Sequence, residues 1–300
     1  METFRISGKD RGKRLDVYMT EKKHWPRFFF MKALKNRKLK VNGKKEEPSY
    51  RLEEGDLITS YVQEEKKEAP LTAVYEDGHI LLLHKPAGLL CMDITGREKD
   101  TLLDRAERYL AARGEGKPYP VHRIDRGTSG LFLVAKDEGT GHILERFFRE
   151  RKIHKTYLCV VLGSVRPEKG RLTHQIFKDA RQNRVFLSDT PVKGSRTAVM
   201  DYESLSEKDG LSLVQCRLIT GRTHQIRGQM SYIGHPLLGD NKYGKKETNK
   251  GYGEKHQLLA AWKLSFDEEL GEGPLAYLAG CSFRDPDADF VKKYFPRFRL

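Results

Sequence analysis

The sequence contains few cysteines and no long hydrophobic run. Its four cysteines, at positions 91, 159, 216 and 281, form no Cys-x-x-Cys pair, so the spacing of a zinc knuckle is missing. The chain begins Met-Glu-Thr-Phe-Arg without the apolar stretch of a signal peptide, and no segment is long and apolar enough to predict a membrane span. These absences favour a reduced, cytoplasmic protein without a metal site over secreted and membrane-spanning classes.

Acidic residues are outnumbered by basic ones. The chain has 56 Lys and Arg against 42 Asp and Glu, which gives a net charge of +14 and a pI near 9.5. An excess of this size predicts a polyanionic partner, usually nucleic acid. An anionic membrane surface is the alternative, but no basic amphipathic stretch stands out. The length of 300 residues suits one large domain with a small appendage.

Half of the net charge lies in the N-terminal fifth of the chain. The first 60 residues hold 16 Lys and Arg and nine Asp and Glu. Apolar spacing predicts a helix over 14–23 and a second helix that Trp25-Pro26 opens. Asn42-Gly43 predicts a hairpin turn, and Gly55-Asp56 precedes a last strand over 57–62. One side of the second helix is apolar and consists of Phe29, Phe30, Ala33 and Leu34.

The stretch from Arg27 to Lys45 has eight basic residues and no acidic one. Solvated helix faces usually mix charge signs, so this run favours contact with a nucleic-acid backbone over an ordinary surface. The candidate RNA-binding residues are Arg27, Lys32, Lys35, Arg37, Lys38, Lys40, Lys44 and Lys45. We expect a small α/β module over 1–62, a charged linker over 63–69 and a larger domain over 70–300.

The most informative segment is His122 to Gly130, which leads into the apolar run Leu131–Ala135. An imidazole, two guanidiniums, a carboxylate and two hydroxyls lie in a glycine-punctuated turn before a predicted buried strand. Arg123 and Arg126 flank Asp125, so this carboxylate should stay ionised and suits a nucleophile or electrostatic partner better than a general acid. The alternative is a surface turn with a salt-bridged aspartate.

This segment resembles the motif His-Arg-Leu-Asp-x-x-Thr-Ser-Gly of RluA-type RNA pseudouridine synthases, with Ile124 in place of leucine. Three more motifs are similar and follow in family order between about Asp77 and Phe266. They are residues 80–90, with His84 where the family has asparagine; Lys155-Thr156-Tyr157 with 160–163; and 221–227 with 233–240. The N-terminal segment resembles the small RNA-binding module first described in a ribosomal small-subunit protein.

The resemblance implies roles for individual residues. Asp125 corresponds to the catalytic aspartate that acts at the ribose anomeric carbon while the uracil detaches, turns and rejoins through carbon 5. Arg227 corresponds to the arginine that pairs with it, and Tyr157 to the tyrosine that stacks on the uracil. Arg123 corresponds to the residue that fills the gap left by the flipped base.

The other polar residues of these motifs are expected to support the substrate or the turn. His122 is expected to be a hydrogen-bonded scaffold residue, and Thr128 and Ser129 to tie the turn through hydroxyl-to-backbone bonds. With Arg123, the candidate substrate-binding residues are His122, Arg126, Thr128, Arg222, His224 and Gln225.

The larger domain has the pattern of an α+β fold. Apolar periodicity predicts helices over 101–112 and 141–151, and glycine and lysine residues predict a mobile basic loop over 244–255. The resemblance, rather than the periodicity, implies a mixed, mostly antiparallel sheet with flanking helices. Strands are predicted over 79–84, 131–135, 157–162, 197–203 and 211–219.

The sequence therefore predicts an RNA pseudouridine synthase, an isomerase without a cofactor or metal. We expect a monomer acting on structured RNA, large-subunit ribosomal RNA first and transfer RNA as the alternative. A non-catalytic RNA-binding or ribosome-assembly factor is a second alternative, although Asp125, Tyr157 and Arg227 are all present.

The predicted turn contains only one carboxylate, Asp125, which argues against a glycosidase with paired acids. Ser129 lacks the glycine motif of a hydrolase oxyanion hole, which argues against a pair with His224.

Two departures from the family pattern lie near the predicted site. Gly228-Gln229 stands where valine-histidine is common, and Leu258-Leu259 where leucine-histidine is usual. Because both flank the site and neither removes a residue that the chemistry needs, they are expected to affect substrate preference.

Overall fold

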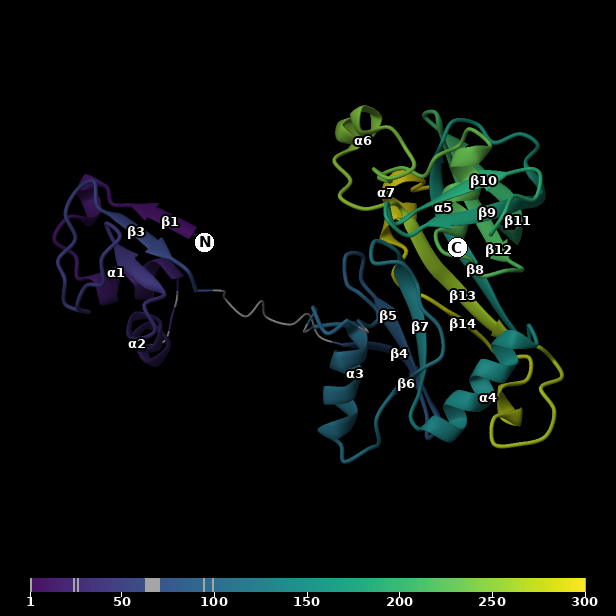
Figure 1. The fold of residues 1–300 in the computed structure, drawn as a ribbon, viewed down its shortest axis with the longest axis horizontal. Helices are drawn as coiled ribbons and strands as arrows, with labels where there is room; N and C mark the ends of the chain where they lie inside the picture. Colours follow the sequence, from purple (N-terminus) through teal and green to yellow (C-terminus); the bar gives the residue numbers. More distant parts are fainter. Residues whose placement is uncertain are drawn as a thin grey trace. The chain divides into compact units, whose positions relative to one another are not determined.

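The chain folds into two compact units, residues 1–69 and 70–300 (Figure 1). The computed structural model describes residues 2–23, 25, 27–62, 71–93, 95–98 and 100–299. The predicted helix start at Pro26, the side chain of Phe29 and the linker over 63–69 lie outside the described residues. Within these ranges, no helix has both the length and the apolar character that crossing a bilayer requires.

The N-terminal unit joins two helices and a three-stranded antiparallel sheet of order β1-β3-β2 around one buried cluster. Asn42 and Gly43 have φ values of 50° and 77°, the two positive angles that a type I′ turn requires, so the predicted turn is confirmed. Phe30 and Leu34 of the predicted apolar side are buried. The elements are β1 (Glu2–Arg5), a 3-10 turn (Gly8–Asp10), α1 (Leu15–Lys23), α2 (Arg27–Lys35), β2 (Leu39–Val41) and β3 (Leu57–Ser60).

The second unit is built on an 11-stranded sheet in which nearly every described pairing is antiparallel, as expected. Its main path runs β10-β9-β11-β12-β8-β13-β7-β5-β4, with β14 paired to β13 and β6 to β7. The strands are β4 (Thr72–Glu76), β5 (Ile80–Lys85), β6 (Tyr119–Pro120), β7 (Ser129–Ala135), β8 (Ile153–Leu162), β9 (Lys169–Asp179), β10 (Arg184–Ser188), β11 (Arg196–Lys208), β12 (Leu211–Leu218), β13 (Leu259–Phe266) and β14 (Ser282–Arg284).

The exception is a short parallel contact between β7 and β13, where Ser129 and Gly130 face Ala260 and Ala261. Gly130 has a φ of 103°, and a Cβ there would lie 2.4 Å from the carbonyl oxygen of Ala261. Only glycine permits so close an approach. Figure 1 shows β7 and β13 diverging from this contact. The segment His122–Gly130 therefore ends where the two halves of the sheet meet.

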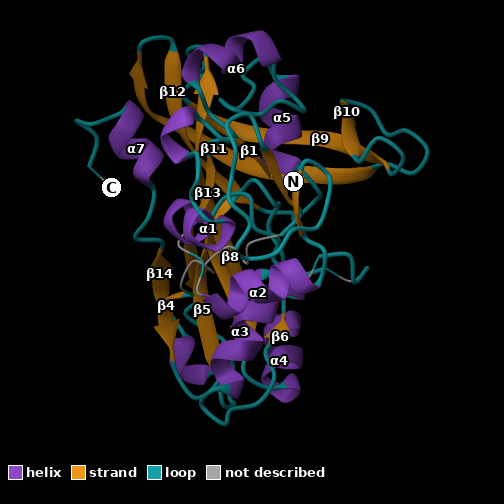
Figure 2. Cartoon of the chain, turned by 90° about the vertical axis from the view of Figure 1, so that its left-hand side faces the viewer, coloured by secondary structure: helices purple, strands orange, loops and turns teal. Residues whose placement is uncertain are grey.

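Helices flank this sheet, and α5 lies against β9 and β10 (Figure 2). The predicted helix over 101–112 is confirmed. The helix predicted over 141–151 begins earlier, because Asp137 accepts a hydrogen bond from the backbone of Thr140 and caps it. The helices are α3 (Leu102–Ala111), α4 (Glu138–Arg149), α5 (Gln225–Tyr232), α6 (Lys246–Tyr252) and α7 (Asp289–Tyr294), with a 3-10 turn at Ala276–Leu278.

The prediction of a mobile loop over 244–255 is wrong, because this segment contains α6. Asn249 of α6 is buried, and its side-chain oxygen accepts a hydrogen bond from the backbone of Gly239 at 2.9 Å. One buried polar contact thus fixes a segment whose composition is that of a loop.

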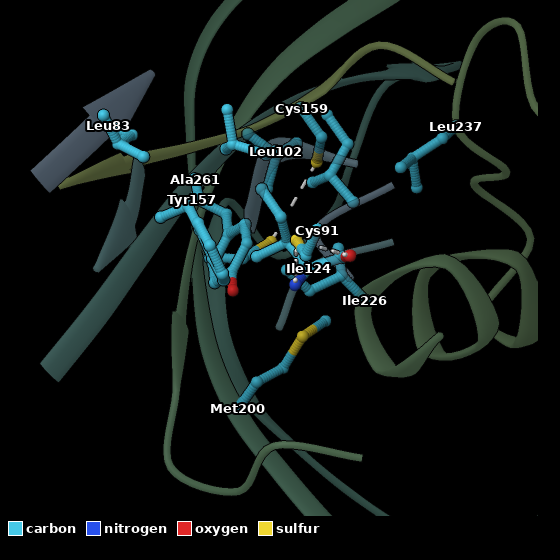
Figure 3. Close-up of a cluster of buried hydrophobic side chains, with 14 of the residues drawn as sticks. Leu83, Cys91, Leu102, Ile124, Tyr157, Cys159, Met200, Ile226, Leu237 and Ala261 are labelled. Atoms are coloured by element: carbon cyan, nitrogen blue, oxygen red, sulfur yellow. Dashed lines mark hydrogen bonds between the residues drawn. The ribbon is translucent and has the colours of Figure 1, made fainter. Parts of the chain in front are cut away.

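The largest core cluster connects the sheet with the segment that carries Asp125 (Figure 3). Ile124 lies in this cluster with Tyr157 of β8, and the Cys91 sulfur is 3.4 Å from both the backbone nitrogen and the backbone oxygen of Ile124. Cys159 and Cys216 are buried in the same cluster with their sulfurs 4.0 Å apart. Apolar packing therefore holds the backbone directly before Asp125.

Candidate active site

A buried lysine fixes the backbone directly after Asp125. Lys85, at the end of β5, is inaccessible to solvent, and its ammonium donates to the carbonyl oxygens of Pro86, Leu89 and Arg126 at 2.8–3.0 Å. Gly88 adds a backbone hydrogen bond to the same Arg126 oxygen. Burial lowers the pKa of Lys85 to about 8. Contacts therefore fix the backbone on both sides of Asp125, through Ile124 before it and Arg126 after it.

The cation that contacts Asp125 comes from far along the chain. Nη1 of Arg227 lies 3.2 Å from Oδ2 of Asp125, across 102 residues of sequence. Arg123 and Arg126, which the sequence placed beside this carboxylate, do not pair with it. Arg126 binds Glu98 at 2.7 Å, and Arg123 is exposed. The contact is the one that the family resemblance implies for Arg227, and the two flanking arginines do not contribute to it.

Arg227 is itself held by a second carboxylate that sequence reasoning missed. Its Nε and Nη2 lie 2.6 and 3.0 Å from the two oxygens of Asp240, a bidentate contact that fixes the guanidinium plane. Burial alone would raise the pKa of Asp240, but Arg227 and the backbone N–H groups of Lys242 and Tyr243 hold it below its ordinary value. The side chain of Asp240 is fully buried, whereas that of Asp125 is 25% exposed. Asp125 is therefore the carboxylate that a substrate can reach.

Two further side chains experience the charge of Asp125. Tyr157 is buried in β8 rather than at its start, and burial together with the Asp125 charge raises the pKa of its phenol, which stays neutral. His224 directly precedes α5, and its Nε2 lies 3.9 Å from Oδ2 of Asp125. Burial lowers the pKa of His224 to about 4. Asp125 thus has a cation, a neutral phenol and a neutral imidazole around it.

The remaining residues of the turn have structural contacts. His122 accepts a hydrogen bond from the backbone of Leu133 at 2.9 Å, and burial lowers its pKa well below the ordinary value, so it lies where a scaffold residue would. Ser129 donates to the carbonyl of Leu259, as expected of a hydroxyl-to-backbone bond. Thr128 differs, because its hydroxyl accepts from the side chain of Gln257.

Other candidate residues contribute less directly than the sequence predicted. Gln225 is buried, its side-chain oxygen accepts from Thr220 and the backbone of Arg222, and its nitrogen donates to Val199 and Gln229. The paired amide holds the loop before α5, and the expected role of Gln225 in substrate binding stays a prediction. Arg222 donates to the carbonyl of Thr197 through Nε and keeps its outer nitrogens free of contacts with the described residues.

The departures from the family pattern shape the packing of α5 against β9 and β10. A Cβ at Gly228 would lie 2.8 Å from the side chain of Leu187 in β10, so a larger residue would require that side chain to move. Gln229 is buried and hydrogen-bonds to His174 and to the backbone of Leu172 and Ala198. His84 binds Asp285 at 2.7 Å and lies outside this region.

The basic residues of the N-terminal unit lie on its surface. Lys40 is half-buried, with its ammonium 5.7 Å from the ring centre of Tyr61. The other seven candidates are exposed. Six of them form no ion pair with any described residue, namely Lys32, Lys35, Arg37, Lys38, Lys44 and Lys45. No cluster of His, Cys, Asp and Glu suited to a metal ion is found in the described part of either unit.

Comparisons with known proteins agree with this geometry. Residues 79–232 match the family model described as RNA pseudouridylate synthase, and residues 13–58 match the S4 domain. The chain is 34% identical over 257 residues to the ribosomal large subunit pseudouridine synthase D of Zymomonas mobilis, covering 81% of this chain and 78% of that protein. It is 32% identical over 284 residues to the ribosomal large subunit pseudouridine synthase C of Escherichia coli, covering 87% of each.

A solved structure shows the same fold. Human RNA pseudouridylate synthase domain containing 4 superposes with a TM-score of 0.58 at 20% identity, covering 71% of this chain and 87% of that one. The fold brings the three motifs that carry Asp125, Tyr157 and Arg227 close together in space. The chain belongs to the RluA-type family of RNA pseudouridine synthases and carries an S4 domain near its N-terminus.

Proposed function

We propose that this synthase isomerises specific uridines of large-subunit ribosomal RNA, with Asp125 acting at the ribose C1′. The observation that carries the proposal is the Asp125–Arg227–Asp240 arrangement, because it presents one reachable carboxylate in a fixed direction. The named relatives of 32–34% identity act on the large ribosomal subunit, which supports this RNA class.

In the proposed reaction, the bond between uracil N1 and C1′ breaks and its electron pair stays with the base. The Asp125 carboxylate stabilises or takes up the electron-deficient C1′, as carboxylates do in glycoside chemistry. The base then turns, C5 bonds to C1′, and C5 loses its proton while N1 gains one. The hydrogen bond from Arg227 holds the Asp125 carboxylate in one direction throughout these steps.

Tyr157 and Arg123 complete the proposed site. We propose that the uracil stacks on the ring of Tyr157, which lies in β8 and is 5% exposed. Arg123 is exposed and has no ion pair with a described residue, so its planar guanidinium is free to replace the flipped base in the RNA stack. We propose that the S4 domain adds backbone contacts through its basic face, and that the enzyme works as a cytoplasmic monomer.

The test is a map of pseudouridines in cellular RNA with and without this protein. The proposal predicts loss of one or more sites in large-subunit ribosomal RNA, and restoration by the wild-type gene but not by Asp125→Asn. If pseudouridines are lost only from transfer RNA, the substrate is transfer RNA and the proposed RNA class is wrong. An unchanged map would contradict the proposal.

A further inference from the structure

A hydrogen-bond chain reaches the candidate site from outside its motifs. The hydroxyl of Tyr243 accepts a hydrogen bond from the backbone N–H of Val185 in β10 at 2.8 Å and lies 2.8 Å from Nδ1 of His224. The backbone of Tyr243 donates to Asp240, and its ring lies 5.1 Å from the Arg227 guanidinium. Tyr243 therefore touches the same group of side chains that aims Asp125.

The hydrogen bonds from Val185 to Tyr243 and between Tyr243 and His224 determine which nitrogen of His224 carries the proton. Val185 already uses one acceptor position of the Tyr243 oxygen, and His224 Nδ1 is the acceptor that the described residues offer to the phenol hydrogen. The proton of the neutral imidazole then sits on Nε2. The opposite tautomer would turn a bare Nε2 lone pair toward the Asp125 carboxylate at 3.9 Å. The backbone of His224 is held at a φ of 50°, so the ring position is set by the start of α5.

His224 is also kept uncharged. Burial, together with the charges of Arg227 and Lys242, lowers its pKa to about 4, although the charges of Asp125 and Asp240 oppose this shift. At neutral pH the side chain is therefore a fixed, neutral N–H donor that points to the carboxylate. A neutral imidazole can polarise a developing oxyanion without transferring a proton.

We propose that the Nε2–H of His224 donates a hydrogen bond to O2 of the target uracil, and that Tyr243 is the positioning residue that fixes this tautomer. The inference rests on the proposed function. O2 is bonded to the carbon next to N1, so it is the base oxygen nearest to C1′ and hence to Asp125. As the N1–C1′ bond breaks, uracil gains negative charge on its oxygens, and a preorganised donor stabilises that state more than the ground state. His224 itself gains and loses no proton.

The tautomer is tested on the full-length protein alone. Two-bond nitrogen–proton NMR correlations of histidine-labelled protein at pH 7, assigned with His224→Gln, should show His224 protonated on Nε2. Tyr243→Phe should shift His224 toward a mixture of tautomers. The control is Tyr202→Phe, which removes another buried hydroxyl, bonded to the Pro167 carbonyl, and should leave the spectrum of His224 unchanged. An Nδ1–H tautomer in the wild-type protein overturns the inference.

The contact to O2 is tested with an RNA fragment that carries the mapped uridine. Replacing that uridine by 2-thiouridine weakens the acceptor, and 4-thiouridine is the matched control. The kcat of the wild-type enzyme should fall about tenfold with 2-thiouridine and stay unchanged with 4-thiouridine. The kcat of His224→Ala on uridine should be about a hundredfold below wild type, and 2-thiouridine should not lower it further. His224→Gln, which restores an N–H donor, should recover part of kcat at unchanged KM.

The two failures are distinguishable. If the wild-type enzyme forms no pseudouridine in any RNA, the proposed function is wrong. If it forms pseudouridine and His224→Ala keeps the full sensitivity to 2-thiouridine, only the assignment of His224 and Tyr243 is wrong.

Discussion

The two units of this protein use positive charge in opposite ways. In the S4-domain unit, Lys32, Lys35 and Lys38 lie on the surface without acidic partners among the described residues. In the synthase unit, Arg227 is buried between Asp125 and Asp240, and Lys85 is buried among three carbonyl oxygens. One unit leaves its cations free, and the other unit fixes them.

The difference matches two physical tasks. Unpaired surface lysines attract a polyanion over a distance and adapt to its shape, but they carry little positional information. A buried, doubly hydrogen-bonded guanidinium cannot adapt, and it therefore holds a reacting carboxylate in one direction. The comparison predicts that charge changes in the synthase unit affect chemistry and stability, and that those in the S4 domain affect binding.

The largest effect is expected from Asp125→Asn. This change keeps the shape of the side chain but removes the charge that acts at C1′, so turnover should fall by about a thousandfold or more. RNA affinity should stay within a few-fold of wild type, because phosphate contacts provide most of the binding. Single-turnover assays with filter binding measure both quantities. A turnover rate near that of the wild type would show that Asp125 takes no part in the reaction.

Arg227→Ala should damage stability as well as activity. It leaves Asp240 buried without its cation, which costs on the order of 3–5 kcal/mol of unfolding free energy. The matched control is Arg217→Ala, because the Arg217–Asp201 pair at 3.0 Å is exposed and such pairs contribute about 0–1 kcal/mol. Urea denaturation of both variants gives the comparison. Equal losses in the two variants would show that burial of the Arg227 pair has no special role.

Neutralising the S4 surface should weaken binding and leave chemistry intact. The triple variant Lys32→Gln, Lys35→Gln, Lys38→Gln should lower the slope of log affinity against log salt by about 2, since each lost phosphate contact removes roughly 0.7–0.9. The single-turnover rate at saturating enzyme should not change. Lysine-to-arginine changes at the same positions are the control and should keep the slope. A wild-type slope in the glutamine variant would mean that this face is ordinary solvated surface.

A smaller effect is expected in the acid range. The folded-state pKa of Asp240 lies below its unfolded value of about 3.9, so its stabilising effect is complete above that value and is lost as the pH falls through the folded pKa. Asp240→Asn should therefore lose less stability than wild type between about pH 4 and 2. Thermal unfolding across this range measures the difference. Parallel curves would indicate that Asp240 is not held by Arg227 in solution.

The sequence predicted the parts of the site that lie in one continuous segment. The His122–Gly130 segment, the strand after it and the role of Arg227 as a partner of Asp125 all follow from local pattern and family motif. Asp240 and Tyr243 could not be placed, because their partners in α5 and β10 are brought together only by the fold. Asp240 did carry one signal, because it is the last residue of the family-like motif over 233–240.

The same limit explains the errors in secondary structure. β9 was not predicted because its side chains are mostly polar and half-exposed, which leaves no hydrophobic alternation to detect. α6 was taken for a loop because composition does not reveal its contacts, in which the buried Asn249 binds the backbone of Gly239 and the side chain of Asn241. In both cases tertiary contacts decide a local structure that composition leaves open.

The most direct test of the account is the single-turnover rate of Asp240→Asn on the RNA that the mapping experiment identifies. Asp240 touches no substrate in the proposed site. Its two oxygens hold Arg227 and, through it, Asp125, and Asp240→Asn keeps an oxygen that can still accept from the backbone of Lys242 and Tyr243. The account predicts a rate reduced by about ten- to a hundredfold at unchanged RNA affinity, because a misaligned carboxylate loses its reacting geometry. A wild-type rate in a folded Asp240→Asn protein would contradict it.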